Sequence, residues 1–215
     1  MEQQETANEI FFVDRRVSQL FANVSEALAA ATDSLLGGET ITAQHVVDGD
    51  SEIDILAAQV QADIWTHLSH SKIDIQQLKH LVGLLLILPE LERSADLAEH
   101  IAQRALVNLG SQMTPTCRGS IQRMSEVALE MWHKAAKVYT DSEILSEDLD
   151  EDDEEMDILY DRLIQEVAKS SIPNQAAAQI ALTARFYERL GDHAVNLARR
   201  IETLSPIATI KNPDY

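Results

Sequence analysis

Thirteen residues of this chain recur in a second copy 96 positions further along. The copies begin at Glu92 and Glu188 and share the pattern E-R-x-x-D-x-A-x-x-[IL]-A-x-R. Residues four apart on an α-helix lie on the same face, so Glu92 and Asp96 project from one side, and Glu188 and Asp192 do the same in the second copy. The sequence therefore predicts two equivalent helical surfaces, each carrying a pair of carboxylates.

A second pair of carboxylates with the same spacing precedes each copy. The first half contains Asp50 and Asp54, and the second half contains Asp153 and Asp157. This repeated order indicates an internal duplication of one helical unit, whose antiparallel helices can bring both pairs of one half face to face. Carboxylates that share a site cannot all stay ionised unaided, so we expect a multivalent metal ion to bind each group.

The composition favours helices throughout. Hydrophobic residues make up 45% of the chain, aromatic residues only 5%, and Gly and Pro are few, which is typical of long helices with a real core. We therefore predict an all-α fold of two tandem three-helix bundles, with six antiparallel helices. The first bundle would comprise residues 1–111, and the second would comprise residues 112–215 with a C-terminal tail.

Apolar periodicity and breaker residues predict where the helices lie. Pro89 falls inside the third helix, where we expect a kink. The tail up to Tyr215 is expected to be frayed. The first three predicted helices cover residues from about 13 to 36, 40 to 70 and 73 to 110. The fourth opens at Thr114 and Pro115 and is marked by apolar residues up to Val138, the fifth follows the acidic run from Asp141 and ends before the break at residues 170–174, and the sixth covers about 174 to 205.

The formal net charge of −19, from 36 acidic and 17 basic residues, argues against direct nucleic-acid binding. The N-terminal residues do not resemble a secretory signal, and the most apolar run, residues 81–88, is far shorter than the roughly 20 residues of a membrane span. A single cysteine, Cys117, fits a reducing compartment. We expect a cytoplasmic protein that meets membranes only through partners.

The second copy, YERLGDHAVNLA over residues 187–198, together with the acidic residues 153–157, resembles the signature of the PhoU family of phosphate-uptake regulators. The resemblance covers nearly the whole chain and implies a three-helix bundle followed by its repeat. Family members carry acid-x-x-x-Asp motifs that bind multinuclear metal clusters. The metal ligands that the resemblance implies here are Asp50, Asp54, Glu92, Asp96, Asp153, Asp157, Glu188 and Asp192.

The resemblance also implies a function and partners. The family acts as a cytoplasmic adaptor between the ATPase of the phosphate ABC transporter and a sensor histidine kinase, and it represses signalling when phosphate is plentiful. By this resemblance the chain would be a negative regulator, a homodimer, and no enzyme. Carboxylates without cysteine favour hard ions such as magnesium, manganese, calcium or ferric iron, and the resemblance implies iron, zinc or other divalent ions, so the identity of the metal stays open.

The first copy departs from the family pattern. Ser94 and Ala95 only approximate the apolar residue and glycine that the second copy supplies. Pro89 lies three residues before the first motif, and His100 has no counterpart histidine in the second copy. The second site is therefore the stronger prediction.

Two other classes of function remain open. A carboxylate-bridged di-iron enzyme on a helical bundle needs Glu-x-x-His on two helices, and the chain has one such motif, Glu130 to His133. A metal-free helical scaffold would use the acidic stripes only for solubility. The sequence shows no catalytic nucleophile, phosphate-cradling glycine loop or nucleotide fingerprint, which argues against catalysis.

Some residues of the repeats have an ordinary structural interpretation. Gly191 marks either a crowded site or a simple contact between helices. Arg93 and Arg189 are expected to pair with the aspartate three residues further on. His193, on a helix surface without a histidine partner, is expected to be solvated rather than a metal ligand.

Overall fold

The computed structural model describes residues 2–70, 73–140 and 145–204, and these residues form long helices with no strand among them. No helix in these ranges is long and apolar enough to cross a membrane. The order of the elements is α1 (Glu2–Gly37), α2 (Thr40–His70), α3 (Ile75–Leu106), the short 3-10 helix η1 (Leu109–Gln112), α4 (Pro115–Thr140), η2 (Ser146–Leu149), α5 (Asp150–Lys169) and α6 (Asn174–Leu204).

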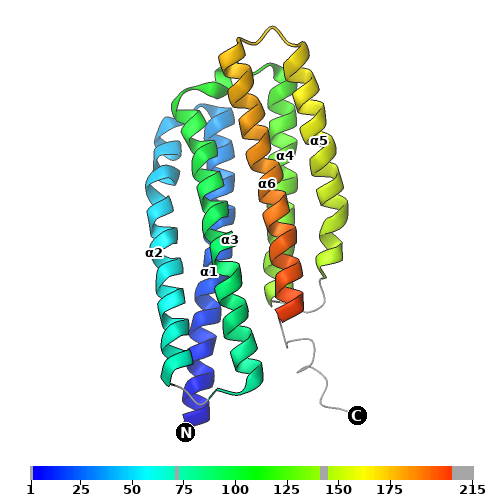
Figure 1. Ribbon diagram of the computed structural model, residues 1–215. Coiled ribbons are helices and arrows are strands. Elements are labelled where there is room, and N and C mark those ends of the chain that lie inside the picture. Colours follow the sequence, from blue (N-terminus) through cyan, green and yellow to red (C-terminus); the bar gives the residue numbers. More distant parts are fainter. Residues whose placement is uncertain (1, 71–72, 141–144, 205–215) are drawn as a thin grey trace.

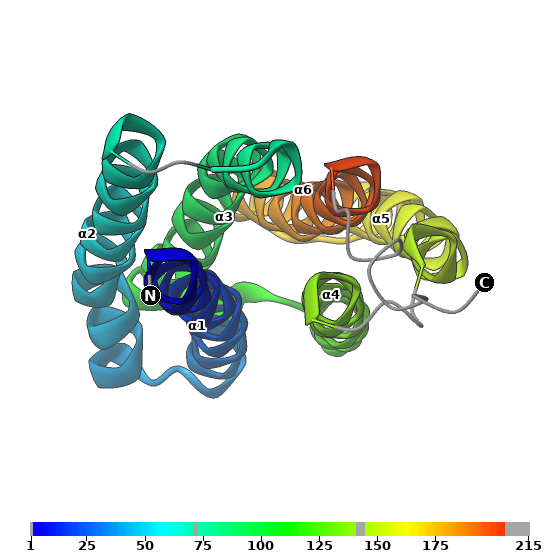
Figure 2. The same cartoon turned by 90° about the horizontal axis from the view of Figure 1, so that it is seen from below.

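The helices form two bundles of three that share a wide contact. Helices α1, α2 and α3 pack on one another, as do α4, α5 and α6 (Figures 1 and 2). The two bundles meet where α1 packs on α4 and α3 packs on α6, so α2 and α5 lie at opposite outer edges (Figure 2). The predicted all-α fold of two three-helix bundles is confirmed, while the division between residues 111 and 112 stays a prediction.

The helix ends follow local sequence signals. Gly38 adopts a φ of 75° and donates its N–H to the carbonyl of Ser34 at 2.8 Å, which terminates α1. Asp74 caps α3 by accepting from two backbone N–H groups of the first turn. Helix α3 ends at Leu106, earlier than predicted, because Asn108 turns into the left-handed region with a φ of 55°. The predicted frayed tail lies outside the described residues.

Pro89 does not end the helix in which it lies. Helix α3 is continuous from Ile75 to Leu106, with Pro89 in its interior. A proline there removes one backbone hydrogen bond, which the flanking helical turns and tertiary packing can tolerate. The E-R-x-x-D copy that follows Pro89 therefore belongs to the same helix as the apolar residues before it.

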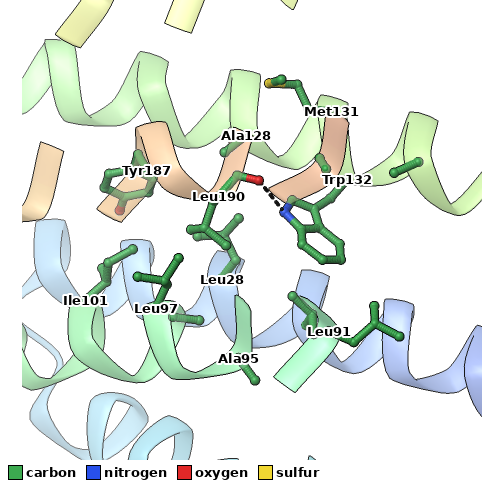
Figure 3. Close-up of a cluster of buried hydrophobic side chains, with 14 of the residues drawn as sticks. Leu28, Leu91, Ala95, Leu97, Ile101, Ala128, Met131, Trp132, Tyr187 and Leu190 are labelled. Atoms are coloured by element: carbon green, nitrogen blue, oxygen red, sulfur yellow. Dashed lines mark hydrogen bonds between the residues drawn. The ribbon is translucent and has the colours of Figure 1, made fainter. Parts of the chain in front are cut away.

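A single hydrophobic core runs through both bundles. Trp132 of α4 is fully buried between the halves, with its ring 5.9 Å from that of Phe21 of α1. The indole N–H donates to the carbonyl of Leu190 of α6 at 3.2 Å, and Leu28 of α1 and Leu91 of α3 lie nearby (Figure 3). Burying one such large apolar side chain contributes roughly 1.5–3 kcal/mol, so the contact between the halves strongly favours one relative placement.

Buried hydrogen bonds cross the same contact. The hydroxyl of Thr32 of α1 lies 2.8 Å from that of Tyr187 of α6, and Ser125 of α4 donates to Thr32 at 2.9 Å. Arg118 of α4 donates to the carbonyl of Leu36 at the end of α1. Buried polar groups are costly when unpaired, so these bonds favour one register of the helices.

A further polar contact joins three helices near the other end of the contact. One carboxylate oxygen of Asp14 of α1 accepts from the hydroxyl of Tyr139 of α4 at 2.5 Å and lies 2.7 Å from Nε2 of His80 of α3. Burial, with the adjacent Asp14 charge, strongly raises the pKa of Tyr139, so its hydroxyl stays neutral and can donate. The two bundles are thus linked by polar contacts at both ends and in the middle.

We predict that Gly110→Ala destabilises the protein by about 2 kcal/mol. A Cβ at this position would lie 1.9 Å from the backbone carbonyl oxygen of Leu35, so the end of α1 or η1 would have to move. Gly119→Ala is the matched control, because its Cβ meets nothing within 4 Å in helix α4, and we expect it to be neutral or to stabilise by up to about 1 kcal/mol. Urea unfolding followed by circular dichroism measures both, and equal effects would contradict the prediction.

Candidate metal centres

The first carboxylate cluster lies where α2 packs against α3. Asp50 and Asp54 come from α2, and Glu92 and Asp96 come from α3. Burial, together with the charges of Asp96, Asp54 and Glu99, raises the pKa of Asp50 to about 6. Burial and the charges of Asp54 and Asp96 also raise the pKa of Glu92. The structure therefore brings the four predicted residues of the first half together, and Glu99 is a fifth carboxylate that the sequence analysis missed.

Solvent can approach the first cluster from the side of α1. A cavity of about 310 Å³ lies between α1 and α2, and Asp50 is part of its lining. Its walls also include Asn23 and Glu26 of α1 and His45 of α2. Ala95 of α3 also lines the cavity, which therefore lies next to the first cluster.

The second carboxylate cluster occupies the equivalent place between α5 and α6. Asp153 and Asp157 come from α5, and Glu188 and Asp192 come from α6. Burial raises the pKa of Asp153, as do the charges of Asp157 and Asp192. Burial also raises the pKa of Glu188, with smaller contributions from Asp192 and Asp157. The four predicted residues of the second half are thus also brought together.

Arginine side chains offset part of the charge in the second cluster. Arg185 forms an ion pair with Glu188 one helical turn further along α6. Arg199 lies 3.2 Å from Asp150 and lowers the pKa of Asp153 against the effect of burial. Neither arginine was predicted to take part in the site. The sequence signal for Arg185 was its spacing of three residues before Glu188.

Each cluster contains one buried carboxylate oxygen without a hydrogen-bond partner. These atoms are Oδ1 of Asp50 in the first half and Oε2 of Glu188 in the second half. A buried acceptor that lacks a donor costs roughly 1–3 kcal/mol, and more when it is charged. A bound cation would remove this cost, because carboxylate oxygens are the ligands that hard metal ions prefer. The residues present therefore fit a metal site in each half.

The carboxylates are not arranged around one point. Within the described ranges, no three His, Cys, Asp or Glu side chains are positioned to hold one ion together. Carboxylates that share a site repel one another. Metal binding would thus require rotation of these side chains, with Glu188 turning away from Arg185.

Two expectations about the repeat residues are resolved by the packing. Gly191 lies against α4, because a Cβ there would come within 3.2 Å of the sulfur of Met131, so the glycine serves the contact between helices. Arg93 does not pair with Asp96 as predicted and lies instead 3.5 Å from a carboxylate oxygen of Glu90. The spacing of three residues was right, but the partner lies on the N-terminal side.

The expectation that His193 is solvated is wrong. His193 is buried where α6 packs on α3, and its Nδ1 lies 3.0 Å from the hydroxyl of Ser94 and 3.8 Å from a carboxylate oxygen of Glu90. Burial lowers the pKa of His193, and the charge of Glu90 opposes this effect. The side chain thus belongs to the contact between the two bundles.

The fold and the candidate sites define an all-α protein of two tandem three-helix bundles with a carboxylate cluster on each. Comparisons with known proteins identify its family. A model of the PhoU domain matches residues 17–105 and again residues 121–201. The chain therefore belongs to the PhoU family.

Relatives in several bacteria share this length and organisation. The phosphate-specific transport system accessory protein PhoU homolog of Rhizobium meliloti is 25% identical over 210 residues, which cover 95% of this chain and 87% of the relative. The PhoU homolog 2 of Mycobacterium bovis is 27% identical over 198 residues, which cover 88% of this chain and 91% of the relative.

Solved structures share the fold. The crystal structure of PhoU from Pseudomonas aeruginosa matches with a TM-score of 0.84 and 19% identity, covering 92% of this chain and 97% of that one. The phosphate transport system regulatory protein PhoU from Streptococcus pneumoniae matches with a TM-score of 0.79 and 17% identity, covering 93% and 96%. The arrangement of six helices is thus that of the family.

We predict that Asp50→Asn stabilises the metal-free protein at pH 8 by about 1 kcal/mol, a value reduced from the full effect because solvent screens this partly exposed group. The pKa of Asp50 rises from 3.8 to about 6 on folding, so its contribution to stability is complete below pH 3.8 and is lost as the pH rises through 6. The advantage of the variant should therefore shrink as the pH falls from 6 to 4.

Urea unfolding with EDTA across pH 4–8 measures this effect. Asp161→Asn is the control, because this exposed α5 side chain lies outside both clusters and should show no comparable dependence. A stability difference for Asp50→Asn that is constant across this pH range would exclude the proposed charge crowding.

Proposed function

We propose that this chain is a metal-loaded regulatory adaptor that restrains phosphate uptake and the phosphate-starvation response. The observation that carries the proposal is the pair of carboxylate clusters, each with pKa values raised by burial and mutual repulsion and each with a buried oxygen that lacks a partner. Such clusters are expensive unless cations neutralise them. Membership of a family of phosphate transport regulators supports the regulatory role.

The proposed ligands are the eight carboxylates predicted from the sequence. When bound, a metal ion supplies charge neutralisation and crosslinks two helices in each half. Iron, zinc, manganese and magnesium are all compatible with oxygen ligands, and carboxylates can bridge more than one ion. The ligands are Asp50, Asp54, Glu92 and Asp96 between α2 and α3, and Asp153, Asp157, Glu188 and Asp192 between α5 and α6.

The proposed partners are the ATPase of the phosphate ABC transporter and a sensor histidine kinase. The relatives carry the name of accessory proteins of the phosphate-specific transport system, which supports a contact with the transporter. We propose that the chain works in the cytoplasm as a homodimer, reaches the membrane only through these partners, and does not bind nucleic acid. Its role would be repression of signalling when phosphate is plentiful, without catalysis of its own.

The arrangement of side chains gives no support to a di-iron enzyme. Glu130 of the one Glu-x-x-His motif lies 3.7 Å from Lys134, and His133 lines a groove between α1 and α4. Neither residue is among the charges that shift the pKa values of the clustered carboxylates. The remaining alternative, a metal-free scaffold, differs from the proposal in metal content.

We predict that the double variant Glu188→Gln and Asp192→Asn loses the metal bound by the second half. Neutral amides bind hard cations much more weakly than carboxylates do, so both changes together should abolish the site. Inductively coupled plasma mass spectrometry of protein purified without chelators measures the stoichiometry. Wild-type protein free of metal would refute the metal-loaded adaptor and favour the scaffold.

The matched control for this experiment is Glu154→Gln with Asp161→Asn. Both residues are exposed on α5, close to the second cluster in sequence, and their removal changes the net charge by the same amount. The control variant should keep the metal content of the wild type. If the two double variants lose equal amounts of metal, the bound ions are held by the general negative charge.

We predict that deletion of the gene raises expression of phosphate-starvation genes in phosphate-rich medium. Loss of a repressing adaptor leaves the kinase active although phosphate is plentiful. Transcript quantification measures the response, and the wild-type gene supplied in trans should restore repression. A pull-down from the membrane fraction under the same growth conditions should recover the transporter ATPase or the kinase, and unchanged transcripts would refute the repressive role.

A further inference from the structure

The seam between α3 and α6 joins the two copies of the repeated motif. The helices run in opposite directions (Figure 1), so residues 96 positions apart occupy equivalent places on either side of the seam. Glu90 of α3 corresponds in this way to Phe186 of α6, and Arg104 of α3 corresponds to Arg200 of α6. One of these places therefore holds arginine at both ends of the seam, while the other holds glutamate at one end and phenylalanine at the other.

At one end of the seam an arginine has a carboxylate partner. Arg200 lies 3.5 Å from a carboxylate oxygen of Glu90, and Arg93 lies at the same distance from the same oxygen. Arg200 also donates to the carbonyl of Leu86 at 2.9 Å. Glu90 thus neutralises the charge of Arg200, and the carbonyl of Leu86 accepts one of its hydrogen bonds.

At the other end the equivalent arginine has no such partner. Phe186 occupies the place of the glutamate, and the guanidinium carbon of Arg104 lies 5.7 Å from the centre of its ring. The imidazole of His100 stacks on the same ring, with centroids 5.4 Å apart. Nε of Arg104 and Nδ1 of His100 are both buried without a hydrogen-bond partner. In the part of the chain that the structure describes, two nitrogens one helical turn apart therefore lack hydrogen-bond partners.

Two carboxylates of the same helices are each paired through one oxygen with a neighbour on their own helix. Glu99 accepts from the amide of Gln103 at 2.8 Å, and Glu188 forms its ion pair with Arg185. Arg104 forms no ion pair with any carboxylate in the described part of the chain. In a protein with a formal net charge of −19, Arg104 is partly buried and, within the described ranges, has neither a carboxylate partner nor an acceptor for its buried Nε.

We propose that Arg104, His100 and Phe186 form a binding site for a phosphate-type oxyanion. A guanidinium presents a planar fork of donors that matches two oxygens of such an anion, and the aromatic ring limits competition from water. The imidazole adds a second donor on the same side of α3. The site uses none of the clustered carboxylates and does not depend on metal.

Isothermal titration calorimetry on the full-length chain tests this proposal. The protein is first dialysed against EDTA, because phosphate also binds metal ions, and is then titrated with inorganic phosphate. We expect saturable binding of one phosphate per chain and a loss of roughly tenfold or more in affinity for Arg104→Gln, since charge-assisted hydrogen bonds are lost. Arg104→Lys, which keeps the charge but not the fork, should bind with intermediate affinity.

Arg200→Gln is the matched control, because it removes the equivalent arginine whose charge Glu90 already matches. This variant should keep the wild-type affinity for phosphate. Circular dichroism establishes that each variant is folded. Absence of saturable binding in the wild type, unchanged affinity in Arg104→Gln, or an equal loss in Arg200→Gln would each overturn the proposal.

A second titration distinguishes the sources of the anion. Phosphoserine carries the same group as a monoester, as in a phosphorylated protein segment. Tighter binding of inorganic phosphate would indicate a site for the free ion, and tighter binding of phosphoserine would indicate a phosphorylated ligand. Both results support the oxyanion site, and weaker binding of both than of acetate would refute it.

Discussion

The burial of apolar side chains between the two bundles is the interaction on which the rest of the structure depends. Helices α1, α3, α4 and α6 make the contact between the bundles around Trp132, and α2 and α5 add their buried side chains to the same core from its outer edges. Each carboxylate cluster is built from one inner helix and one outer helix, α3 with α2 and α6 with α5. Because α3 and α6 are fixed against each other, the relative position of the two clusters is fixed as well. A cation that crosslinks an outer helix to its inner neighbour therefore acts on a rigid frame.

The carboxylate clusters work against the stability that this core provides. The pKa values of Asp50, Glu92, Asp153 and Glu188 are all raised, so ionisation at neutral pH lowers the free energy of unfolding. A scaffold selected for stability alone would gain from amides at these positions. Destabilising charges that persist in both halves of a duplicated chain are expected where the charges bind something. The loss of stability caused by these ionised carboxylates thus supports the proposed metal-loaded form more directly than the spacing of the acids does.

The sequence predicted well what depends on periodicity and poorly what depends on contacts across the chain. The six helices and the two groups of four acids follow from spacings of three, four and 96 residues, and the packing of α2 on α3 and of α5 on α6 brings those acids together. The burial of His193 was missed because it requires the contact of α6 with Ser94 of α3, which no local pattern reveals. The partner of Arg93 was missed because Glu90 and Asp96 lie equally far from it along the helix, so the spacing alone does not choose between them.

The two halves of the duplicated chain differ at the seam between α3 and α6, where one half has a glutamate and the other has a phenylalanine beside the arginine of the opposite helix. If α3 and α6 had identical sequences, a glutamate at the position of Glu90 would meet an arginine at the position of Arg104 at both ends of the seam. Two ion pairs would then form. Replacement of one glutamate by Phe186 keeps the hydrophobic part of the contact and releases one arginine from its internal partner. The carboxylate clusters, by contrast, lie on the outer pairs of helices, where neither half constrains the other, and both copies keep the acid spacing. The seam thus supplies a positive site between two negative ones, an arrangement that a single unduplicated bundle cannot form.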